Sequence, residues 1–429
     1  MPHRPASAAS VSTPVLDRPS ATPGHPRGGL SAVIMLWCLT RLWLVPTAAG
    51  VNPFTGHGRI DPSVDKVYRG WYEVLGNGSF PLHDVTWQYP PGAALPVLAP
   101  ALVPGLDYGR AFIALTALCD ILIFVMLLCV ARVAGRGLAG AWFWTVGLAV
   151  LSTMPWNRFD LLVTGLAMAA LVVASNQRAW SDRVFGVLVA LGSMVKMWPV
   201  LLLIGTRKGR RTRRVWVAAA LTTLAVTASF VLTMPNAFSF LSGQRSRGIQ
   251  IESVGALPFH LARHLGWSGT WAAKDGSHEF VGPCVEGVSL IMQALTVLAF
   301  GWLLYWRRRS DLGHSHALPD AALTATLLFV VTSRVISPQY MVWLIGLAAV
   351  CLLRPDTTQR PVACLLLAAC VLTTLDFPLL YRELRDDGAP LAIANLYARN
   401  LLLVAAAVLS GLRLWRATAL RPVDRSFPG

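Results

Sequence analysis

The chain has 429 residues, of which 55% are hydrophobic and only 14% are charged, whereas a soluble domain carries about 25% charged residues. This composition excludes an ordinary soluble enzyme and predicts a protein that lies mainly in the bilayer. The net charge of +16 does not indicate a nucleic-acid partner, because the basic residues cluster at the ends of hydrophobic runs.

The two ends of the chain differ from the region between them. Residues 1–28 are rich in Pro, Ser and Ala and have no apolar period, so we expect a disordered N-terminal segment on the cytoplasmic side. Residues 417–429 form a short C-terminal tail, also expected in the cytoplasm. Residues 29–416 are expected to form one transmembrane domain.

Apolar runs long enough to cross a membrane recur through this domain. A helix needs about 20 apolar residues to cross about 30 Å of hydrocarbon, and unpaired backbone groups cannot face lipid. The sequence therefore predicts an all-α, polytopic membrane helical bundle with about ten transmembrane helices. The predicted spans are 30–50, 109–131, 138–154, 160–176, 214–234, 284–306, 320–334, 338–353, 361–379 and 391–413.

The charges between these spans predict the orientation. Ten crossings place both termini on one side, and the basic loops, such as 208–214 and 307–309, all fall on that side. By the positive-inside rule this side is the cytoplasm, and a plasma-membrane location is expected. Two long loops, 51–107 and 235–283, then lie outside, where functional residues are expected.

Two segments do not fit simple crossings. Residues 184–205 are long enough to cross once, but basic residues at both ends belong on the cytoplasmic side. We expect this segment to enter the membrane and turn back between Lys196 and Pro199, because proline cannot continue a helix ladder. The proline-rich stretch 92–106 is also expected to be re-entrant or interfacial.

The first outer loop contains an amphipathic pattern. Tyr68, Trp71, Tyr72 and Leu75 recur at helical spacing, so this segment is predicted to form an interfacial helix with Asp65 near its start. An isolated aspartate at such a position is more often a helix cap than a catalytic group. The residue pattern alone therefore leaves the role of Asp65 open.

Seven short motifs follow one another along the chain. They are Asp65-x-x-Tyr68, Gly78-x-x-Pro81-x-x-Asp84-Val85, Tyr89-Pro90-Pro91-Gly92, Asn157-Arg158-Phe159-Asp160-Leu161-Leu162, Lys196-x-Trp198-Pro199, Arg247-Gly248-Ile249-Gln250-Ile251-Glu252-Ser253 and Ile336-Ser337-Pro338-Gln339-Tyr340. As an ordered set, these motifs resemble the signature of glycosyltransferase family 87. The resemblance runs from about residue 30 to about residue 413.

The resemblance implies a GT-C fold and the transfer of a hexose, mannose first, from a polyprenyl-phosphate-linked donor. The acceptor would be an envelope glycolipid or polysaccharide on the extracytoplasmic face, and no cofactor or metal is expected. The resemblance gives the role of catalytic base to Asp65. Because Gln339 and Tyr340 stand where some mannosyltransferases of the family carry histidine, a pentose donor such as arabinose stays open.

A lipid-phosphate leaving group keeps its charge and needs cations to hold it. Arg158, Lys196 and Arg334, with Arg245 and Arg247, are candidates, although Arg158 could instead pair with Asp160 and Arg334 could snorkel to the interface. The second outer loop adds polar groups for sugar hydroxyls. The predicted substrate-binding residues are Tyr68, Asp84, Tyr89, Arg158, Asp160, Lys196, Gln244, Arg247, Gln250, Glu252, Arg334, Gln339 and Tyr340.

Two alternatives need separate tests. His260 and His264 stand four residues apart, but without a third ligand they are weak evidence for zinc. A transporter or flippase of lipid-linked sugars would also contain buried charges and broken helices. The sequence favours the enzyme, because no second copy of the break at residues 196–199 is found.

Overall fold

The computed structural model describes residues 27–51, 58–81, 84, 87–133, 137–176, 178–238, 240, 248–274 and 276–419. Most of the predicted N-terminal segment and of the predicted C-terminal tail lies outside these residues. The first described helix already begins at Arg27 and the last continues to Thr418.

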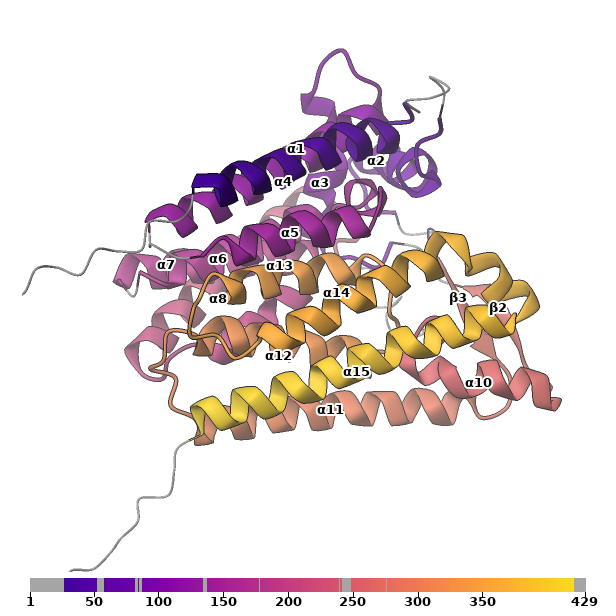
Figure 1. Ribbon diagram of the computed structural model, residues 1–429. Helices are drawn as coiled ribbons and strands as arrows, with labels where there is room; N and C mark the ends of the chain where they lie inside the picture. The colour runs from indigo at the N-terminus through magenta and orange to yellow at the C-terminus, as the bar shows by residue number, and fades with distance from the viewer. Residues whose placement is uncertain are drawn as a thin grey trace, which may run out of the picture.

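The described chain is a bundle of helices that run roughly side by side (Figure 1). Six helical segments in the described residues are long and apolar enough to cross a membrane. They are α1 (Arg27–Ala48), α4 (Tyr108–Val133), α8 (Arg210–Thr233), α11 (Val285–Arg309), α14 (Arg360–Thr374), which continues into η8 (Leu375–Leu379), and α15 (Pro390–Thr418).

Shorter helices complete the bundle. They are α5 (Ala139–Val150), α6 (Asp160–Ala174), α7 (Ala179–Val195), α12 (Ala317–Thr332) and α13 (Tyr340–Leu352). The predicted all-α membrane bundle is confirmed, whereas ten crossings stay a prediction, because several of these helices are shorter than a full span.

Burial separates inner helices from outer ones. Residues Met341–Cys351 of α13 are all buried, so this helix is apolar on every side and lies at the centre of the bundle. By contrast, large apolar side chains of α1 and α8 are exposed, including Leu42 at 73% and Leu224 at 66%. Such a surface is expected to face lipid.

Glycines allow the central helices to approach closely. A Cβ on Gly140 of α5 would lie 2.4 Å from the carbonyl oxygen of Ala349 in α13, and one on Gly346 would lie 2.3 Å from Thr164 of α6. Small residues at helix contacts are a common packing device in membranes, where close backbone approach provides van der Waals contact.

Gly140→Ala should therefore destabilise the protein by about 1–3 kcal/mol, the usual cost of overpacking. Thermal unfolding in mild detergent measures this effect. Gly287→Ala in α11 is the matched control, because a Cβ there meets no heavy atom within 4 Å. An unchanged midpoint for Gly140→Ala would show that α5 and α13 can move apart without cost.

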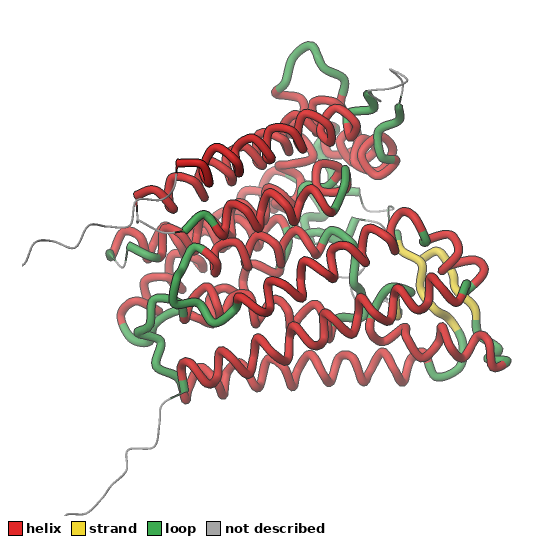
Figure 2. The backbone as a smooth tube through the Cα atoms, viewed as in Figure 1, coloured by secondary structure: helices red, strands yellow, loops and turns green. Residues whose placement is uncertain are grey.

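Short elements gather at the end of the bundle remote from both described termini. A three-stranded antiparallel sheet has the order β1-β3-β2 and pairs Phe280 with both Ile249 and Trp271; Figure 2 shows these strands in yellow. The elements are η1 (Ser63–Tyr68), α2 (Arg69–Gly76), β1 (Ile249–Gln250), η6 (Val254–Ala256), α10 (Leu257–Ala262), η7 (Arg263–Leu265), β2 (Thr270–Lys274), β3 (Ser277–Val281) and η9 (Glu383–Asp387).

The predicted reversal in residues 184–205 is present. Helix α7 ends at Val195, Lys196 is extended, and η5 (Trp198–Gly205) returns along α7. Pro199 packs back against Gly192. The far end of η5 is fixed because Arg307, in the last turn of α11, donates to the carbonyl of Ile204.

The proline-rich stretch near the end of the first outer loop forms three short helices. They are η2 (Pro91–Ala93), α3 (Ala94–Leu98) and η3 (Ala99–Leu102). A Cβ on Gly92 would lie 2.6 Å from the carbonyl oxygen of Met194. This stretch therefore reaches the C-terminal end of α7, beside the turn that carries Lys196.

Candidate active site

A lysine and an aspartate form a buried ion pair where α7 ends. The Lys196 ammonium lies 2.8 Å from both carboxylate oxygens of Asp160, the first residue of α6. The indole N–H of Trp343 donates to Asp160 Oδ1 at 2.6 Å. The Lys196 and Asp160 side chains are 7% and 0% exposed, so each charge depends on the other for its stability.

Aromatic rings enclose the Lys196 ammonium. Its Nζ lies 4.8 Å from the ring centroid of Phe159, 5.1 Å from that of Tyr89 and 5.7 Å from that of Trp343, within the range of cation–π attraction. Tyr340 stacks on Trp343 with centroids 4.0 Å apart. We call this group the Lys196 cluster: Tyr89, Phe159, Asp160, Lys196, Tyr340 and Trp343.

Arg158 pairs with a carboxylate that the sequence did not single out. Its Nη1 lies 3.2 Å from Asp61 Oδ1 and donates to the Asn157 carbonyl at 2.7 Å. Burial raises the pKa of Asp61, but the Arg158 charge and the hydrogen bonds from Ser63 and Arg158 outweigh burial and hold that pKa below its usual 3.8. Asp61 is therefore ionised at neutral pH.

Asp65 lies one turn further along and is exposed. It lines a groove of about 490 Å³ together with Lys66, Arg110 and other residues. Just before η1, Asp61 Oδ1 accepts a hydrogen bond from the Ser63 N–H at 2.8 Å. The two carboxylates thus lie in different surroundings.

Of the other predicted first-loop residues, Tyr89 belongs to the Lys196 cluster and Tyr68 packs against it. Tyr68 is buried and packs on Phe159, and Tyr89 packs on the same ring, with centroids 5.3 and 5.2 Å away. Asp84 accepts a hydrogen bond from the Trp71 indole N–H at 2.7 Å. Tyr68 and Tyr89 therefore shape this site, while Asp84 is held against the buried face of α2.

A second polar group is built around the second outer loop. The Gln250 amide donates to Glu252 Oε2 at 2.8 Å and accepts from the Ile336 N–H at 2.8 Å. The Gln250 N–H donates to the carbonyl of Arg334 at 3.0 Å, and the Arg334 guanidinium donates to Ser289 at 3.3 Å. The predicted residues Gln250, Glu252 and Arg334 therefore lie together.

Charged residues of η8 and α15 complete the polar group around Gln250 and Glu252. Arg399 of α15 is fully buried and lies 3.3 Å from the Asp376 carboxylate. Its other amino group donates to the carbonyl of Glu252, to which the Asn400 amide also donates at 3.2 Å. We call Gln250, Glu252, Asp376, Arg399 and Asn400 the Glu252 cluster.

The loop between α12 and α13 joins the two clusters. Ile336 bonds to Gln250 of the Glu252 cluster, and Tyr340 stacks within the Lys196 cluster. Gln339 stands between them as the N-cap residue of α13. The motif Ile336–Tyr340 therefore spans the short distance between two buried charged groups.

Three of the candidate residues, Gln244, Arg245 and Arg247, lie outside the residues that the structure describes. His260 donates to the carbonyl of Ile251 at 2.7 Å, whereas His264 donates to that of Gly388 at 2.9 Å. The histidines thus hold two different segments in place. Within the described residues, no group of three metal-ligating side chains is present.

Burial, followed by the Asp376 charge, raises the pKa of Glu252 to about 8, and Arg399 opposes the rise. The folded-state value lies above the unfolded 4.5, so the folded protein holds this proton more tightly. Its contribution to stability is complete below about pH 4.5 and is lost as the pH rises to about 8. The thermal midpoint should therefore fall over this window and then level off.

Glu252→Gln should flatten this pH profile, because an amide resembles the protonated carboxyl and does not titrate. Glu286→Gln on the exposed first turn of α11 is the control. Thermal unfolding in detergent across the pH range measures both. A profile that stays equally steep in Glu252→Gln would assign the titration to another group.

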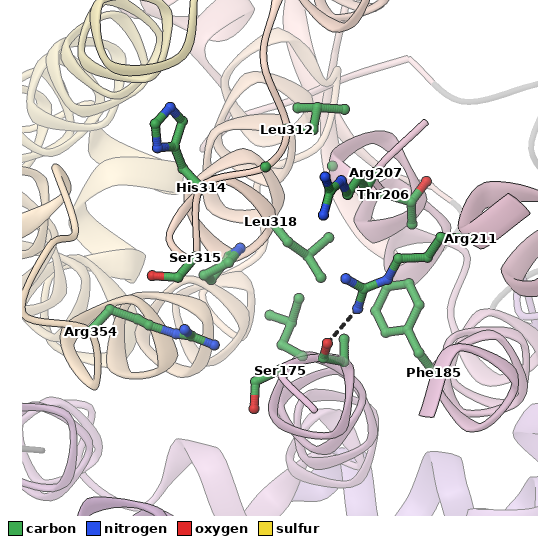
Figure 3. A pocket seen from close by; sticks show the side chains of 15 residues that line it. Ser175, Phe185, Thr206, Arg207, Arg211, Leu312, His314, Ser315, Leu318 and Arg354 are labelled. Carbon is green, nitrogen blue, oxygen red and sulfur yellow. Dashed lines mark hydrogen bonds between the residues drawn. The ribbon is translucent and has the colours of Figure 1, made fainter. Parts of the chain in front are cut away.

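One cavity among the described residues lies at the end of the bundle opposite the Lys196 cluster. A small cavity of about 40 Å³ is lined by Arg207, Arg211 and Arg354 among others. In Figure 3, Arg207 and Arg211 lie on one side of Leu318 and Arg354 lies on the other. This cavity is separate from the Lys196 cluster, because Arg207 and Arg354 follow the far ends of η5 and α13.

Asp61, Asp376, Arg399 and Trp343 were not predicted. Asp376 and Arg399 stand inside predicted spans, and a charge within an apolar run is a recognised signal of a functional or paired residue. Asp61 has no comparable signal, because it lies outside the Asp65-x-x-Tyr68 motif. Trp343 is one of several tryptophans in apolar runs, and only the fold brings it to Asp160.

Comparison with known proteins gives one match. The family model for glycosyltransferase family 87 matches residues 87–338, more than half of the chain. No curated protein and no solved structure gives a significant match. The match includes Arg158, Asp160, Lys196, Gln250 and Glu252. The chain therefore belongs to glycosyltransferase family 87, which is one of the GT-C type families of membrane glycosyltransferases.

Proposed function

We propose that this chain transfers a hexose, mannose first, from a polyprenyl-phosphate-linked donor to an envelope glycolipid or polysaccharide. The observation that carries the proposal is the pairing of a first-loop carboxylate, Asp61, with Arg158 beside the Lys196 cluster. A donor that stays in the bilayer fits a family of membrane glycosyltransferases. It also fits a site that lies at the ends of the central helices.

The reaction needs a base and a cation. An acceptor hydroxyl attacks the anomeric carbon of the sugar, and the bond from that carbon to the phosphate oxygen breaks. The electron pair leaves with the polyprenyl phosphate, and the hydroxyl proton passes to a carboxylate. This single displacement inverts the anomeric configuration and needs no covalent intermediate.

The resemblance assigns the base to Asp65, and the geometry adds Asp61 as a second candidate. We propose Asp61 for this role, because it is kept ionised and already lies against a cation. Asp65 remains the alternative that the same substitutions test. In this proposal Arg158 forms hydrogen bonds to the donor phosphate when the donor binds, because phosphate is more strongly charged than a carboxylate. The Asp61 carboxylate then becomes available to accept the proton of the acceptor hydroxyl.

Arg158 is the proposed phosphate ligand. Among the described residues, its side-chain hydrogen bonds come only from Nη1, so the rest of the guanidinium can meet a phosphate edge-on. Lys196 acts differently in our proposal. Its ammonium is surrounded by Asp160 and three rings, so it fixes the first turn of α6 next to Arg158 and does not contact the donor.

The same proposal places the clusters on the extracytoplasmic side of the plasma membrane. Both described termini lie at the other end of the bundle (Figure 1). Basic segments also meet there, since Lys208 bonds to the carbonyl of Arg308 and Arg413 to that of Thr358. The positive-inside rule supports a cytoplasmic position for that end.

The test uses membranes that contain the full chain and two radiolabelled donors, polyprenyl-phosphate mannose and polyprenyl-phosphate arabinose. We expect label to move from mannose donor to membrane glycolipid or polysaccharide. Transfer of label from the arabinose donor alone would mean that the donor sugar is arabinose and that the proposed type of reaction still holds. If neither sugar is transferred, while the donor crosses between leaflets of proteoliposomes, the chain is a flippase.

A further inference from the structure

A groove between α7 and α8 lies at the end of the bundle opposite the Lys196 cluster. It has a volume of about 650 Å³ and is lined by Arg183 of α7 and by residues of the first turns of α8. Arg183 precedes Lys196 by 13 positions, which is about 20 Å along a helix axis. The groove is therefore distinct from the site of the proposed sugar transfer.

The mouth of the groove carries four positive charges. They belong to Arg183, Arg210, Arg213 and Arg214. The neighbouring carboxylate of Asp182 lies 2.6 Å from Arg211 and 3.7 Å from Arg214, so it is already shared. Within the described part of the chain, Arg183, Arg210 and Arg213 form no ion pair.

Three of these arginines lie at the N-terminus of α8, where positive charge is electrostatically unfavourable. Arg210 to Arg214 form the first turn of α8, which has no acidic residue. The partial positive charge of a helix N-terminus repels cations. An anion bound at the mouth of the groove would relieve this repulsion, and guanidinium groups hold phosphate well.

The floor of the groove is apolar. Val217 and Leu221 of α8 line it and are 50% and 62% exposed. Leu221 follows Arg213 by eight residues, which is about 12 Å along the helix. The hollow thus has a cationic end and an apolar end, in the order in which a phospholipid presents its headgroup and its acyl chain.

We propose that this groove binds an anionic phospholipid of the leaflet opposite the Lys196 cluster, with its phosphate among the four arginines and an acyl chain along Val217 and Leu221. Basic hollows between transmembrane helices are known recognition sites for such headgroups. The proposal does not depend on the proposed transfer reaction, since no residue is shared between the two sites.

The test measures lipid binding to the purified full chain in mild detergent by native mass spectrometry and by thermal stabilisation. Dioleoyl phosphatidylglycerol, dioleoyl phosphatidylcholine, glycerol 3-phosphate and inorganic phosphate are the probes. We expect phosphatidylglycerol to bind and raise the unfolding midpoint, and the other three to have little effect. Binding should weaken at least about tenfold in Arg210→Gln/Arg213→Gln, which is a loss of about 1.4 kcal/mol.

Arg308→Gln/Arg309→Gln is the matched control, because it removes the same charge at the same end of the bundle outside the groove. It should bind phosphatidylglycerol as the parent chain does. An equal loss in both double variants would overturn the proposal in favour of nonspecific charge attraction. Equal stabilisation by inorganic phosphate would overturn it in favour of a phosphate-ion site.

Discussion

Asp61→Asn should lower the rate of sugar transfer by about 10²–10⁴-fold, the usual contribution of a positioned general base. The amide keeps the size of the side chain and an oxygen for the Ser63 and Arg158 hydrogen bonds, but it cannot take a proton. Transfer of label from polyprenyl-phosphate mannose in membranes measures the rate. The unfolding midpoint of the same preparation shows whether the variant is folded.

Two further variants make this result specific. Asp107→Asn lies in the same groove as Asp65 and removes a carboxylate paired with Arg110, so it should transfer sugar almost as the parent chain does. Asp65→Asn should do the same if Asp61 is the base. If Asp65→Asn loses activity and Asp61→Asn retains it, Asp65 is the base, and if both retain activity, neither carboxylate is.

Lys196→Met should destabilise the folded chain by about 3–5 kcal/mol, the cost of leaving one partner of a buried ion pair alone. Asp160 is 0% exposed, and among the described residues the remaining hydrogen-bond donor to its carboxylate would be the Trp343 indole N–H. Denaturant or thermal unfolding in detergent measures the loss. The yield of monodisperse protein should fall with it.

The double variant Lys196→Met/Asp160→Asn is the informative companion. It removes both charges and keeps an oxygen for Trp343, so it should be more stable than Lys196→Met alone. If the losses of unfolding free energy in the two single variants add up to the loss in the double variant, the two side chains do not interact. A stable double variant that also transfers sugar would show that the Lys196–Asp160 pair is dispensable for chemistry, whereas a stable but inactive one would show that the pair is needed for transfer.

The positions of the helices could be predicted from the sequence, since apolar runs and their basic flanks follow from the cost of burying charge in lipid. The reversal at Lys196–Pro199 was predictable for the same reason. The lengths were less accurate. The spans predicted at 138–154 and 338–353 correspond to the shorter helices α5 and α13, because an apolar run marks burial of any kind, inside protein or in lipid.

The pairings within the site could not be predicted, because they join residues far apart in the chain. Lys196 and Asp160 are separated by 36 positions and Asp61 and Arg158 by 97. Sequence spacing offered the pairing of Arg158 with Asp160 as an alternative, but Asp160 Oδ atoms bond to Lys196 instead. The sequence thus predicted several of the charged residues of the candidate site, whereas their ion-pair partners depend on how the helices pack.

The lengths of α12 and α13 bear on how a donor arrives. They have 16 and 13 residues, so they rise about 24 and 20 Å, less than the about 30 Å thickness of the hydrocarbon layer. If both helices start at the cytoplasmic surface, the loop that joins them ends about 6–10 Å short of the opposite headgroups. In the proposed reaction, a prenyl-linked donor would reach this loop by sideways diffusion in one leaflet, without lifting its tail into water.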